Sequence, residues 1–314
     1  MFTYLLALVP FLLFSFSNLI SQLFSSSPPQ IRRLPRPQLN EDLLALESPG
    51  NQTSCSPNPY TVHVFSRAPL VLYIENFLSQ DERAHLLEIS EPLYAPSTVT
   101  HDAGGTTHRD PAVRDSEVAL VPRTATVRCV EERARALQGW RDEVWIERLR
   151  VQRYRPGGHY AHHFDWSTGR GGWGRVSSFM VWVDDGSLSR GRGRHHHDEG
   201  DSGKEKEEVM VVVEEEEEVK LEGGGTEFPL LRAGQDPRWC RFVECPGSGP
   251  ESGASERQKG KGVVFKPLPG NAVFWENFMA DGTGRGYDET WHAGLPVKKG
   301  VKVGLNIWSW GRIE

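Results

Sequence analysis

The segment VQRYRPGGHYAHHFDW, residues 151–166, combines short strand-forming runs with a paired-glycine turn. Side chains alternate between the two faces of a β-strand, so residues two apart point the same way. His163 and Asp165 therefore share one face and can reach a single metal ion, whereas the neighbouring His162 points to the other face. Because a His-x-Asp pair occurs by chance in many proteins, it predicts a metal site only where the chain supplies a third ligand.

His292, in the segment DETWHAGLPV, is the candidate for that third ligand. Two imidazoles and one carboxylate on one triangular face of an iron ion leave three positions open for oxygen and a co-substrate. A second histidine cluster, His195, His196 and His197, lies among Arg, Gly and acidic residues. For that cluster a surface loop is favoured over a dedicated metal site.

Lys302 follows His292 by ten residues, in the expected strand VKVGLNIWSW. It shares one face of that strand with Asn306 and Trp308. The other face is apolar and carries Val301, Val303, Leu305 and Ile307. A lysine that projects into the interior is costly unless it meets an anion. The distal carboxylate of 2-oxoglutarate would be that anion; the alternative is an exposed edge strand with a solvated lysine.

The rest of the chain predicts a β-rich fold preceded by helices. After Trp140, short apolar runs separated by Gly, Pro and Asp are typical of a sandwich or barrel. Ahead of them, Ser79 and Glu82 form the pattern of a capping box at a helix start. Apolar residues three and four apart across 125–139 predict a second helix. We therefore expect an α+β, mainly β, fold.

The N-terminal part divides into a targeting segment and a linker. Residues 1–25 have the length and apolar character of a signal peptide or a membrane-spanning signal anchor, and the lack of a small-x-small cleavage site favours the anchor. Residues 26–60, rich in Ser, Pro, Asn and Gln, are expected to form a flexible stem. One domain is expected over 61–314, with a low-complexity acidic insert at about 186–222 that we interpret as a surface loop.

Charge and cysteine content indicate the compartment and exclude one class of partner. The net charge is −6, and the acidic excess is concentrated in the insert, so the chain has no basic footprint for nucleic acid. Asn51 begins an Asn-x-Thr glycosylation acceptor. Four cysteines permit disulfides in an oxidising lumen, and none of the CxxC spacings of zinc modules is present: Cys55, Cys129, Cys240 and Cys245. Cys240 with Cys245 is the easiest pair. We expect the protein to lie in the secretory pathway, in the endoplasmic reticulum lumen, either membrane-anchored or soluble after cleavage of the N-terminal segment.

In this combination the sequence resembles the prolyl 4-hydroxylase α-subunit-like iron(II)- and 2-oxoglutarate-dependent dioxygenases. The resemblance covers roughly 69–310 and is interrupted by the acidic insert. The matching pieces, in chain order, are RYRPGGHYAHHFDW, RVSSFMVWVDD, GGGTEFP, PGNAVFWEN and HAGLPVKKGVKVGLNIW. The resemblance implies a double-stranded β-helix, or jelly-roll, core with flanking N-terminal helices.

The resemblance also implies roles for individual residues. The implied iron ligands are His163, Asp165 and His292. Lys302 would bind the 2-oxoglutarate carboxylate, with Tyr154 as a hydroxyl partner. Tyr160 and Arg175 would lie on the substrate side. Family members commonly require L-ascorbate, which re-reduces the iron after uncoupled turnover.

Two positions depart from the family pattern. Trp310 stands where members acting on peptidyl proline often have a histidine, and His159 replaces the usual glutamine after the paired glycines. These changes leave the iron chemistry untouched and bear on the substrate. We expect a hydroxylase that uses O2 and acts on proline in a peptide or protein, with a proline-rich segment as its substrate. The alternatives are an oxygenase acting on a non-prolyl residue or a small molecule, and a non-catalytic binding protein, which would need none of the metal and lysine residues.

Overall fold

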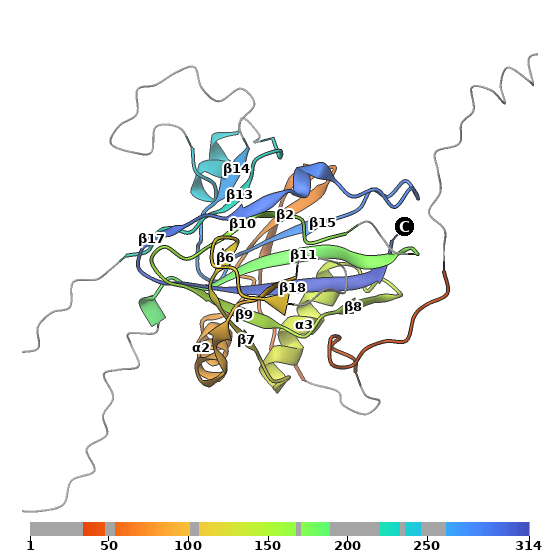
Figure 1. Ribbon diagram of the computed structural model, residues 1–314, viewed down its shortest axis with the longest axis horizontal. Coiled ribbons are helices and arrows are strands. Elements are labelled where there is room, and N and C mark those ends of the chain that lie inside the picture. The colour runs from red at the N-terminus through yellow and green to blue at the C-terminus, as the bar shows by residue number, and fades with distance from the viewer. Residues whose placement is uncertain are drawn as a thin grey trace, which may run out of the picture.

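The computed structural model describes seven stretches of the chain, which together form the β-rich body seen in Figure 1. They are 34–47, 54–100, 107–167, 171–188, 220–232, 236–245 and 262–313. The expected targeting segment at 1–25, Asn51 and most of the expected insert lie outside these residues. Within the described stretches, no helix has the length and apolar character needed to cross a membrane.

Nine strands form the larger of two main sheets, in the order β1-β2-β15-β11-β18-β9-β7-β3, with β8 also paired to β18. The long strands β11 and β18 run antiparallel through its centre (Figure 1). The bounds are β1 (Thr61–Arg67), β2 (Leu70–Glu75), β3 (Ala95–Pro96), β7 (Glu117–Leu120), β8 (Val144–Ile146), β9 (Arg150–Tyr154), β11 (Trp173–Asp184), β15 (Ala272–Glu276) and β18 (Lys302–Arg312).

Five strands form the smaller main sheet, in the order β14-β13-β16-β10-β6. Two further strand pairs, β4 with β5 and β12 with β17, extend the structure outside the main sheets. The bounds are β4 (Val99–Thr100), β5 (Thr107–His108), β6 (Arg114–Asp115), β10 (His159–His163), β12 (Glu222–Gly223), β13 (Thr226–Phe228), β14 (Val263–Phe265), β16 (His292–Gly294) and β17 (Val297–Lys299).

The connection between the two main sheets defines the architecture. From β9 onward the chain passes repeatedly from one sheet to the other, and the larger sheet contains the order β15-β11-β18-β9 while the smaller contains β14-β13-β16-β10. Two four-stranded antiparallel sheets wound in this way make a jelly-roll, or double-stranded β-helix. The expected mainly β fold with a double-stranded β-helix core is confirmed.

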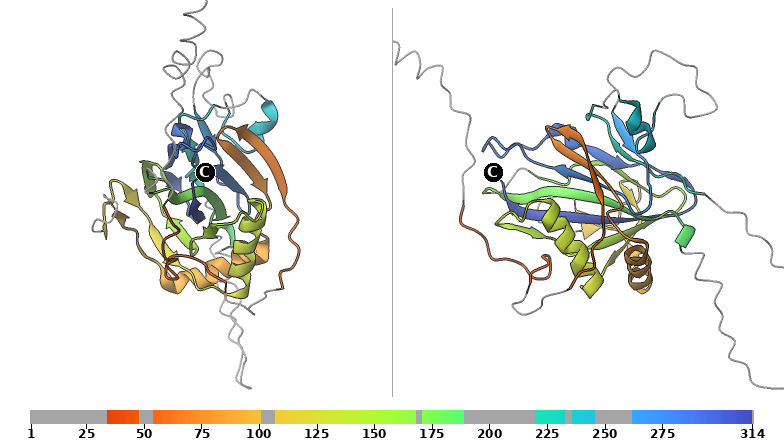
Figure 2. Two further views of the ribbon diagram at one scale, coloured as in Figure 1. Left: turned by 90° about the vertical axis from the view of Figure 1, so that its right-hand side faces the viewer. Right: turned by 180° about the vertical axis from the view of Figure 1, so that it is seen from behind.

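Two helices, α2 (Gln80–Ser90) and α3 (Ala125–Leu137), cover one face of the larger sheet (Figure 2). Ser79 caps α2, because its Oγ accepts from the Glu82 amide while the Glu82 carboxylate accepts from the Ser79 amide. This is the expected capping box. Three short 3-10 helices complete the described elements: η1 (Glu91–Leu93), η3 (Pro237–Arg241) and η4 (Asp288–Thr290).

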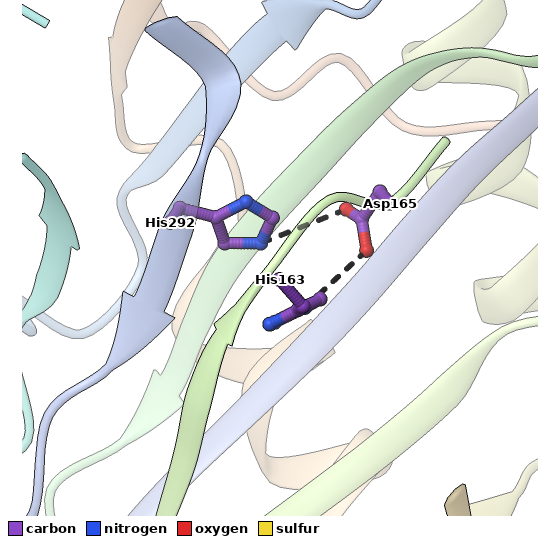
Figure 3. A group of neighbouring side chains, drawn as sticks. All are labelled: His163, Asp165 and His292. Atoms are coloured by element: carbon purple, nitrogen blue, oxygen red, sulfur yellow. Dashed lines mark ion pairs between the residues drawn. The ribbon is translucent and has the colours of Figure 1, made fainter. Parts of the chain in front are cut away.

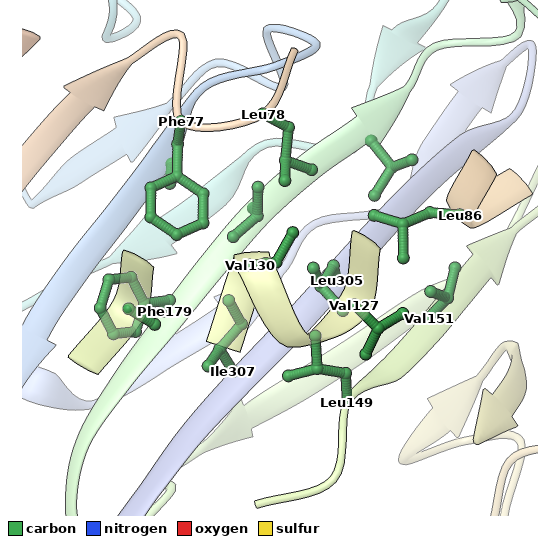
Figure 4. Packing of buried hydrophobic residues seen from close by; sticks show 14 of the residues in the cluster. Phe77, Leu78, Leu86, Val127, Val130, Leu149, Val151, Phe179, Leu305 and Ile307 are labelled. Carbon is green, nitrogen blue, oxygen red and sulfur yellow. The ribbon is translucent and has the colours of Figure 1, made fainter. Parts of the chain in front are cut away.

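Each face of the larger sheet has its own core. Under the helices, the alternate residues Val303, Leu305 and Ile307 of β18 are at most 3% exposed and pack with apolar side chains of both helices (Figure 4). Between the two sheets lies a second cluster that contains many aromatic rings, including Tyr73, Trp182, Phe228, Phe265 and Trp275. The alternation predicted for the last strand is therefore confirmed, and its other face is directed to the space between the sheets.

Part of the expected flexible stem is packed against the domain. Leu44 is 3% exposed, and its neighbours exchange backbone hydrogen bonds with the end of β8 and the residues that follow it. Ala45 N–H donates to Ile146 O (2.8 Å), and Arg148 N–H donates to Leu43 O (2.8 Å). These contacts hold the stem where composition predicted flexibility, because a few apolar residues within it find a partner in the folded domain.

Both cysteine pairs form disulfides. Cys240 and Cys245, the pair expected from sequence, are joined. Cys55 is joined to Cys129, which lies 74 residues away in α3. The second bond ties the stem to a helix of the domain, a connection that sequence spacing left open.

Candidate metal centre

The three predicted iron ligands meet in the space between the two sheets (Figure 3). The ligand atoms of His163, Asp165 and His292 all lie within 4.8 Å of one another. His163 ends β10, His292 begins β16, and these two residues are paired across the antiparallel strands. Asp165 lies in a bend two residues beyond the end of β10, rather than within the strand as the alternation pattern predicts. The bend brings the carboxylate to the same side as both imidazoles.

Backbone carbonyls set which nitrogen of each imidazole faces the centre. The Nδ1 atoms of His163 and His292 lie 2.8 Å from the carbonyl oxygens of Ala161 and Thr290, respectively. Since a carbonyl oxygen only accepts, each Nδ1 carries a proton and donates it. In the neutral rings, each Nε2 then directs a lone pair towards Asp165. A hydrogen bond from the second nitrogen to a carbonyl is the usual way in which a metal-binding histidine is oriented.

The distances within the triad fit a cation better than direct hydrogen bonds. His163 Nε2 lies 3.6 Å from Asp165 Oδ1, and His292 Nε2 lies 3.8 Å from Asp165 Oδ2. Both separations exceed hydrogen-bonding distance. Two nitrogen lone pairs and a buried carboxylate that face one another across such gaps form a donor set that suits iron(II), with two imidazoles and one carboxylate.

The protonation states of His292 and Asp165 are those that metal ligands require. Burial, together with the neighbouring His163, lowers the pKa of His292 to about 4, so the imidazole is neutral near pH 7. Burial by itself would raise the pKa of Asp165, but the contact with His163 and the nearby His292 hold that pKa well below its usual range. A neutral imidazole and an ionised carboxylate bind a metal without first losing a proton.

Aromatic rings fix the orientation of both imidazoles. Tyr160 stacks on His163 with ring centroids 3.7 Å apart, and the guanidinium of Arg114 lies 4.6 Å from the centroid of the Tyr160 ring. Phe228 stacks on His292 at 5.4 Å, and Trp275 meets the same ring edge-on at 4.9 Å. The two imidazoles therefore have little freedom to rotate away from Asp165.

Lys302 lines the same pocket as the triad. Its side chain is only 1% exposed, and Nζ donates to the carbonyl oxygen of Gly224 (2.8 Å) and lies 4.6 Å from the centroid of the Tyr154 ring. Burial lowers the pKa of Lys302 to about 8, and no carboxylate of the described residues offsets this effect. A buried ammonium without an ionic partner suits a pocket that receives a carboxylate.

Gly224 is needed at its position for two reasons. Its φ of +71° is unfavourable for residues with a side chain, and a Cβ there would lie 3.2 Å from both Lys302 Cδ and Val297 Cγ2. The glycine-rich motif GGGTEFP thus allows the backbone to approach the lysine and accept its hydrogen bond.

Around Lys302, the structure adds polar groups that the sequence did not single out. Tyr154 OH donates to Gln152 Oε1 (2.9 Å), while Gln152 Nε2 is buried without a partner among the described residues. Thr226, 4% exposed, lines the same pocket. The sequence carries only a weak signal for these two residues. Gln152 is two residues from Tyr154 and so shares its face of the strand, and Thr226 follows the glycine-rich motif.

Arg175, predicted to lie on the substrate side, does not line this pocket. Its guanidinium binds the buried carboxylate of Glu147 through two hydrogen bonds of 2.6 and 2.9 Å and lies 3.9 Å from the ring centroid of Trp308. The positive charge contributes to lowering the pKa of Asp165, so Arg175 is close enough to the triad to influence it. Its role in substrate binding stays a prediction.

The other histidines of the motif lie outside the triad. His162 contacts Glu227 (Nε2 to Oε2, 2.8 Å) and points away from Asp165, as its place in the alternation predicts. His159 lies near the carbonyl oxygens of Gly157 and Ala112, each at 3.1 Å. The cluster at 195–197 lies outside the described residues.

The chain is similar to known oxygenases over the region that contains the triad and Lys302. Residues 149–310 match the 2OG-Fe(II) oxygenase superfamily. A protein of Arabidopsis thaliana described as probable prolyl 4-hydroxylase 10 is 25% identical over 267 residues, which cover 81% of this chain and 73% of the relative.

Two solved structures are also similar. A viral collagen prolyl hydroxylase from Paramecium Bursaria Chlorella virus-1, solved as a 2OG complex, is 18% identical, with a TM-score of 0.44, over 77% of this chain and 96% of that one. A prolyl-4-hydroxylase of Pseudomonas putida is 13% identical, with a TM-score of 0.44, over 79% and 95% of the respective chains.

The family match spans more than half of the chain and includes the whole triad and Lys302. The chain belongs to the 2OG-Fe(II) oxygenase superfamily, and within it the chain is similar to prolyl hydroxylases. Iron(II) and 2-oxoglutarate are therefore the metal and co-substrate of its family.

Proposed function

We propose that this protein hydroxylates proline in a peptide or protein substrate, with iron(II) held by His163, Asp165 and His292. The observation that carries the proposal is the convergence of two Nε2 lone pairs on the Asp165 carboxylate, in one pocket with a buried ammonium at Lys302. The prolyl 4-hydroxylase relative supports the choice of proline.

In this proposal Lys302 binds the distal carboxylate of 2-oxoglutarate. The ammonium loses its contact with water on folding, so pairing with a carboxylate returns much of the free energy that burial cost. Thr226 lies in the same pocket and can donate a hydroxyl proton to the same carboxylate, and Gln152 Nε2 is a second available donor. The phenol of Tyr154 holds the Gln152 amide and places its ring under the ammonium.

With oxygen, the bound metal and 2-oxoglutarate supply an oxidation strong enough to hydroxylate an unactivated C–H bond. The side chains of this protein contribute binding, orientation and exclusion of water. Trp275 and Met180 cover the pocket with apolar surface between the sheets. On the substrate side, we assign binding of the peptide to Tyr160, beside His163, and to Arg175, held by Glu147.

The proposal also covers the cellular compartment in which the protein acts. We infer that the protein acts in the secretory pathway, in the endoplasmic reticulum lumen, with residues 1–25 serving as a signal peptide or anchor and Asn51 as a glycosylation acceptor. Two disulfides, Cys55–Cys129 and Cys240–Cys245, support an oxidising compartment. L-ascorbate is proposed as the reductant, as in the family that the sequence resembles.

A second candidate is an oxygenase that acts on a non-prolyl residue or a small molecule. It is favoured by one observation: Trp310 replaces the histidine that relatives acting on peptidyl proline often have. In the structure Trp310 is stacked on Trp173 with ring centroids 5.2 Å apart, so a pair of indole rings stands where a histidine would be.

Succinate formation tests the proposal and separates the two candidates. The purified protein would be supplied with iron(II), ascorbate and 2-oxoglutarate, with and without proline-rich peptides, beside His163→Ala and the matched control His162→Ala. We expect peptide-stimulated succinate and hydroxyproline in the wild type and in His162→Ala, and neither in His163→Ala. Succinate that no peptide stimulates would favour the second candidate, and equal turnover in both variants would contradict the assignment of the metal site.

A further inference from the structure

Three tryptophans from neighbouring strands form a continuous aromatic surface at one end of the larger sheet. Trp310 in β18 stacks on Trp173 in β11 (5.2 Å between ring centroids), and Trp145 in β8 lies 6.0 Å from Trp310 and 6.5 Å from Trp173. Trp145 and Trp310 are half-buried, so parts of both rings face solvent. We call these three residues the tryptophan surface.

The tryptophan surface adjoins the pocket. Trp310 lies on the same face of β18 as Lys302 and Asn306, because residues an even number apart share a face. With a rise of about 3.3 Å per residue, Trp310 lies about 13 Å along the strand from Asn306, which lines the pocket. Arg175 is paired with Trp310 across β11 and β18. An extended segment of a few residues can therefore span from the pocket to the surface.

The chain's own residues 34–37, Leu-Pro-Arg-Pro, lie on this surface. The Trp173 Nε1–H donates to the carbonyl oxygen of Leu34 (3.2 Å), and the Leu34 amide donates to the carbonyl oxygen of Gly171 (3.0 Å). The guanidinium of Arg36 lies 5.7 Å from the centroid of the Trp145 ring. Figure 1 shows this segment, in red, passing the ends of β8 and β18. An indole donor on a carbonyl and aromatic rings beneath a proline-containing segment are how aromatic grooves bind extended proline-rich peptides.

The segment is pre-shaped for this contact but loosely held. Leu34 and Arg36 each precede a proline, which restricts them to extended conformations, so the tetrapeptide needs little ordering to bind. All four of its residues are exposed, and the Leu34 side chain is 44% exposed. The two hydrogen bonds of the Leu34 backbone, one of them from the Trp173 indole, and the arginine contact are thus its principal attachments, and another peptide of the same chemistry can replace it.

We propose that the tryptophan surface is a binding site for extended segments that contain proline and arginine, occupied in the resting chain by residues 34–37. A substrate segment of this chemistry binds only when the chain's own segment leaves. The proposal deepens the proposed function and rests on it, because that function identifies the incoming segment as part of a substrate. It also assigns Trp310 a role in peptide binding.

Fluorescence anisotropy of a labelled peptide that copies residues 31–40, IRRLPRPQLN, tests the proposal on the full-length protein without iron. In the first comparison, Pro35→Gly, Arg36→Ala and Pro37→Gly are combined to release the resident segment. We expect the combined variant to bind the peptide at least about threefold more tightly than the wild type. In the wild type, the apparent affinity is proportional to the fraction of molecules whose surface the resident segment leaves free.

The second comparison uses that released variant as background. Adding Trp173→Phe keeps a ring but removes the indole donor, and we expect affinity to fall about fivefold, as for the loss of one hydrogen bond. Adding Trp140→Phe, at an exposed tryptophan outside the surface, is the control and should change nothing. A peptide with both prolines replaced by alanine should bind more weakly.

Two results would overturn the proposal: equal affinity of the wild type and the released variant, or equal affinity with and without Trp173→Phe. Because binding is measured without turnover, its outcome is independent of the proposed function. Peptide binding without succinate formation would contradict hydroxylation alone, whereas normal peptide-stimulated turnover with no binding at the tryptophan surface would contradict this proposal alone.

Discussion

The two faces of β18 are both buried but have opposite surroundings. On the helix face, Leu305 and Ile307 are fully buried among apolar side chains that need no hydrogen-bond partner. On the pocket face, Lys302 is 1% exposed and keeps its charge with a single backbone carbonyl as hydrogen-bond acceptor. The helix face stabilises the fold, whereas the buried charge on the pocket face costs free energy that a bound carboxylate can offset. Substitutions on the two faces should therefore separate stability from activity.

The largest effect is expected from Lys302→Met, which keeps an unbranched side chain one atom shorter but removes its charge. Turnover of 2-oxoglutarate should fall at least about 1000-fold, equivalent to about 4 kcal/mol, because the co-substrate carboxylate is left buried without its partner. Succinate formation at increasing 2-oxoglutarate concentrations measures this loss. Turnover within about threefold of the wild type would show that the carboxylate is bound elsewhere.

Leu305→Ala makes the converse change on the helix face. Removing this buried side chain should lower the free energy of unfolding by about 3 kcal/mol, through lost burial and the cavity left behind. Turnover per folded molecule should stay within about twofold of the wild type. Urea denaturation followed by circular dichroism gives the first quantity and succinate formation the second. If Leu305→Ala had normal stability but low turnover, the helix face would not be the one that serves stability alone.

Lys302→Met should also stabilise the protein in the absence of ligand. The pKa of Lys302 is about 8 in the folded protein and 10.5 when unperturbed, so the unfolded state binds more protons between these values. Stability therefore rises with pH across this interval, and the full cost of the buried charge is present below about pH 8. We expect a gain on the order of 2 kcal/mol at pH 7 that shrinks towards pH 10.5. Unfolding measured at both pH values checks it, and a loss of stability at pH 7 would count against the prediction.

The smallest effect concerns the pH dependence of 2-oxoglutarate binding. Lys302 is protonated below about pH 8 in the free protein and loses its charge above this value. The Michaelis constant for 2-oxoglutarate should therefore be flat up to about pH 8 and rise up to about tenfold per pH unit beyond it. Lys302→Arg, which stays charged, is the control for other titrating groups. The same rise in the wild type and in Lys302→Arg would assign the effect to another group.

Local sequence patterns predicted the strand faces, one helix start and part of the grouping of candidate metal ligands. Alternation in β18 separated the helix face from the pocket face, and the capping box located the start of α2. The spacing of His163 and Asp165, together with a distal His292, led to a cluster that the structure brings together. The strand faces, the helix start and the His163–Asp165 pair depend on one element or on residues close in sequence, for which local geometry is decisive. His292 lies far away in the chain and was found within the motif that resembles the oxygenase family.

Features that depend on long-range packing were not predicted. The position of Asp165 in a bend beyond β10 required the three-dimensional path of the chain. The buried partner of Arg175, Glu147, comes from a segment 28 residues away, and Cys55 pairs with Cys129 across 74 residues. Residues 34–47 were expected to be flexible because their composition is that of a linker, yet Leu44 is buried against the chain after β8.

Iron(II) binding under anaerobic conditions tests the central claim most directly. Isothermal titration calorimetry would compare the wild type, His163→Ala and His162→Ala, two substitutions at neighbouring residues that point in opposite directions. The account predicts one iron ion per chain in the wild type and in His162→Ala, and an affinity at least about 100-fold weaker in His163→Ala. Equal binding by all three proteins would contradict the assignment of the metal to His163, Asp165 and His292.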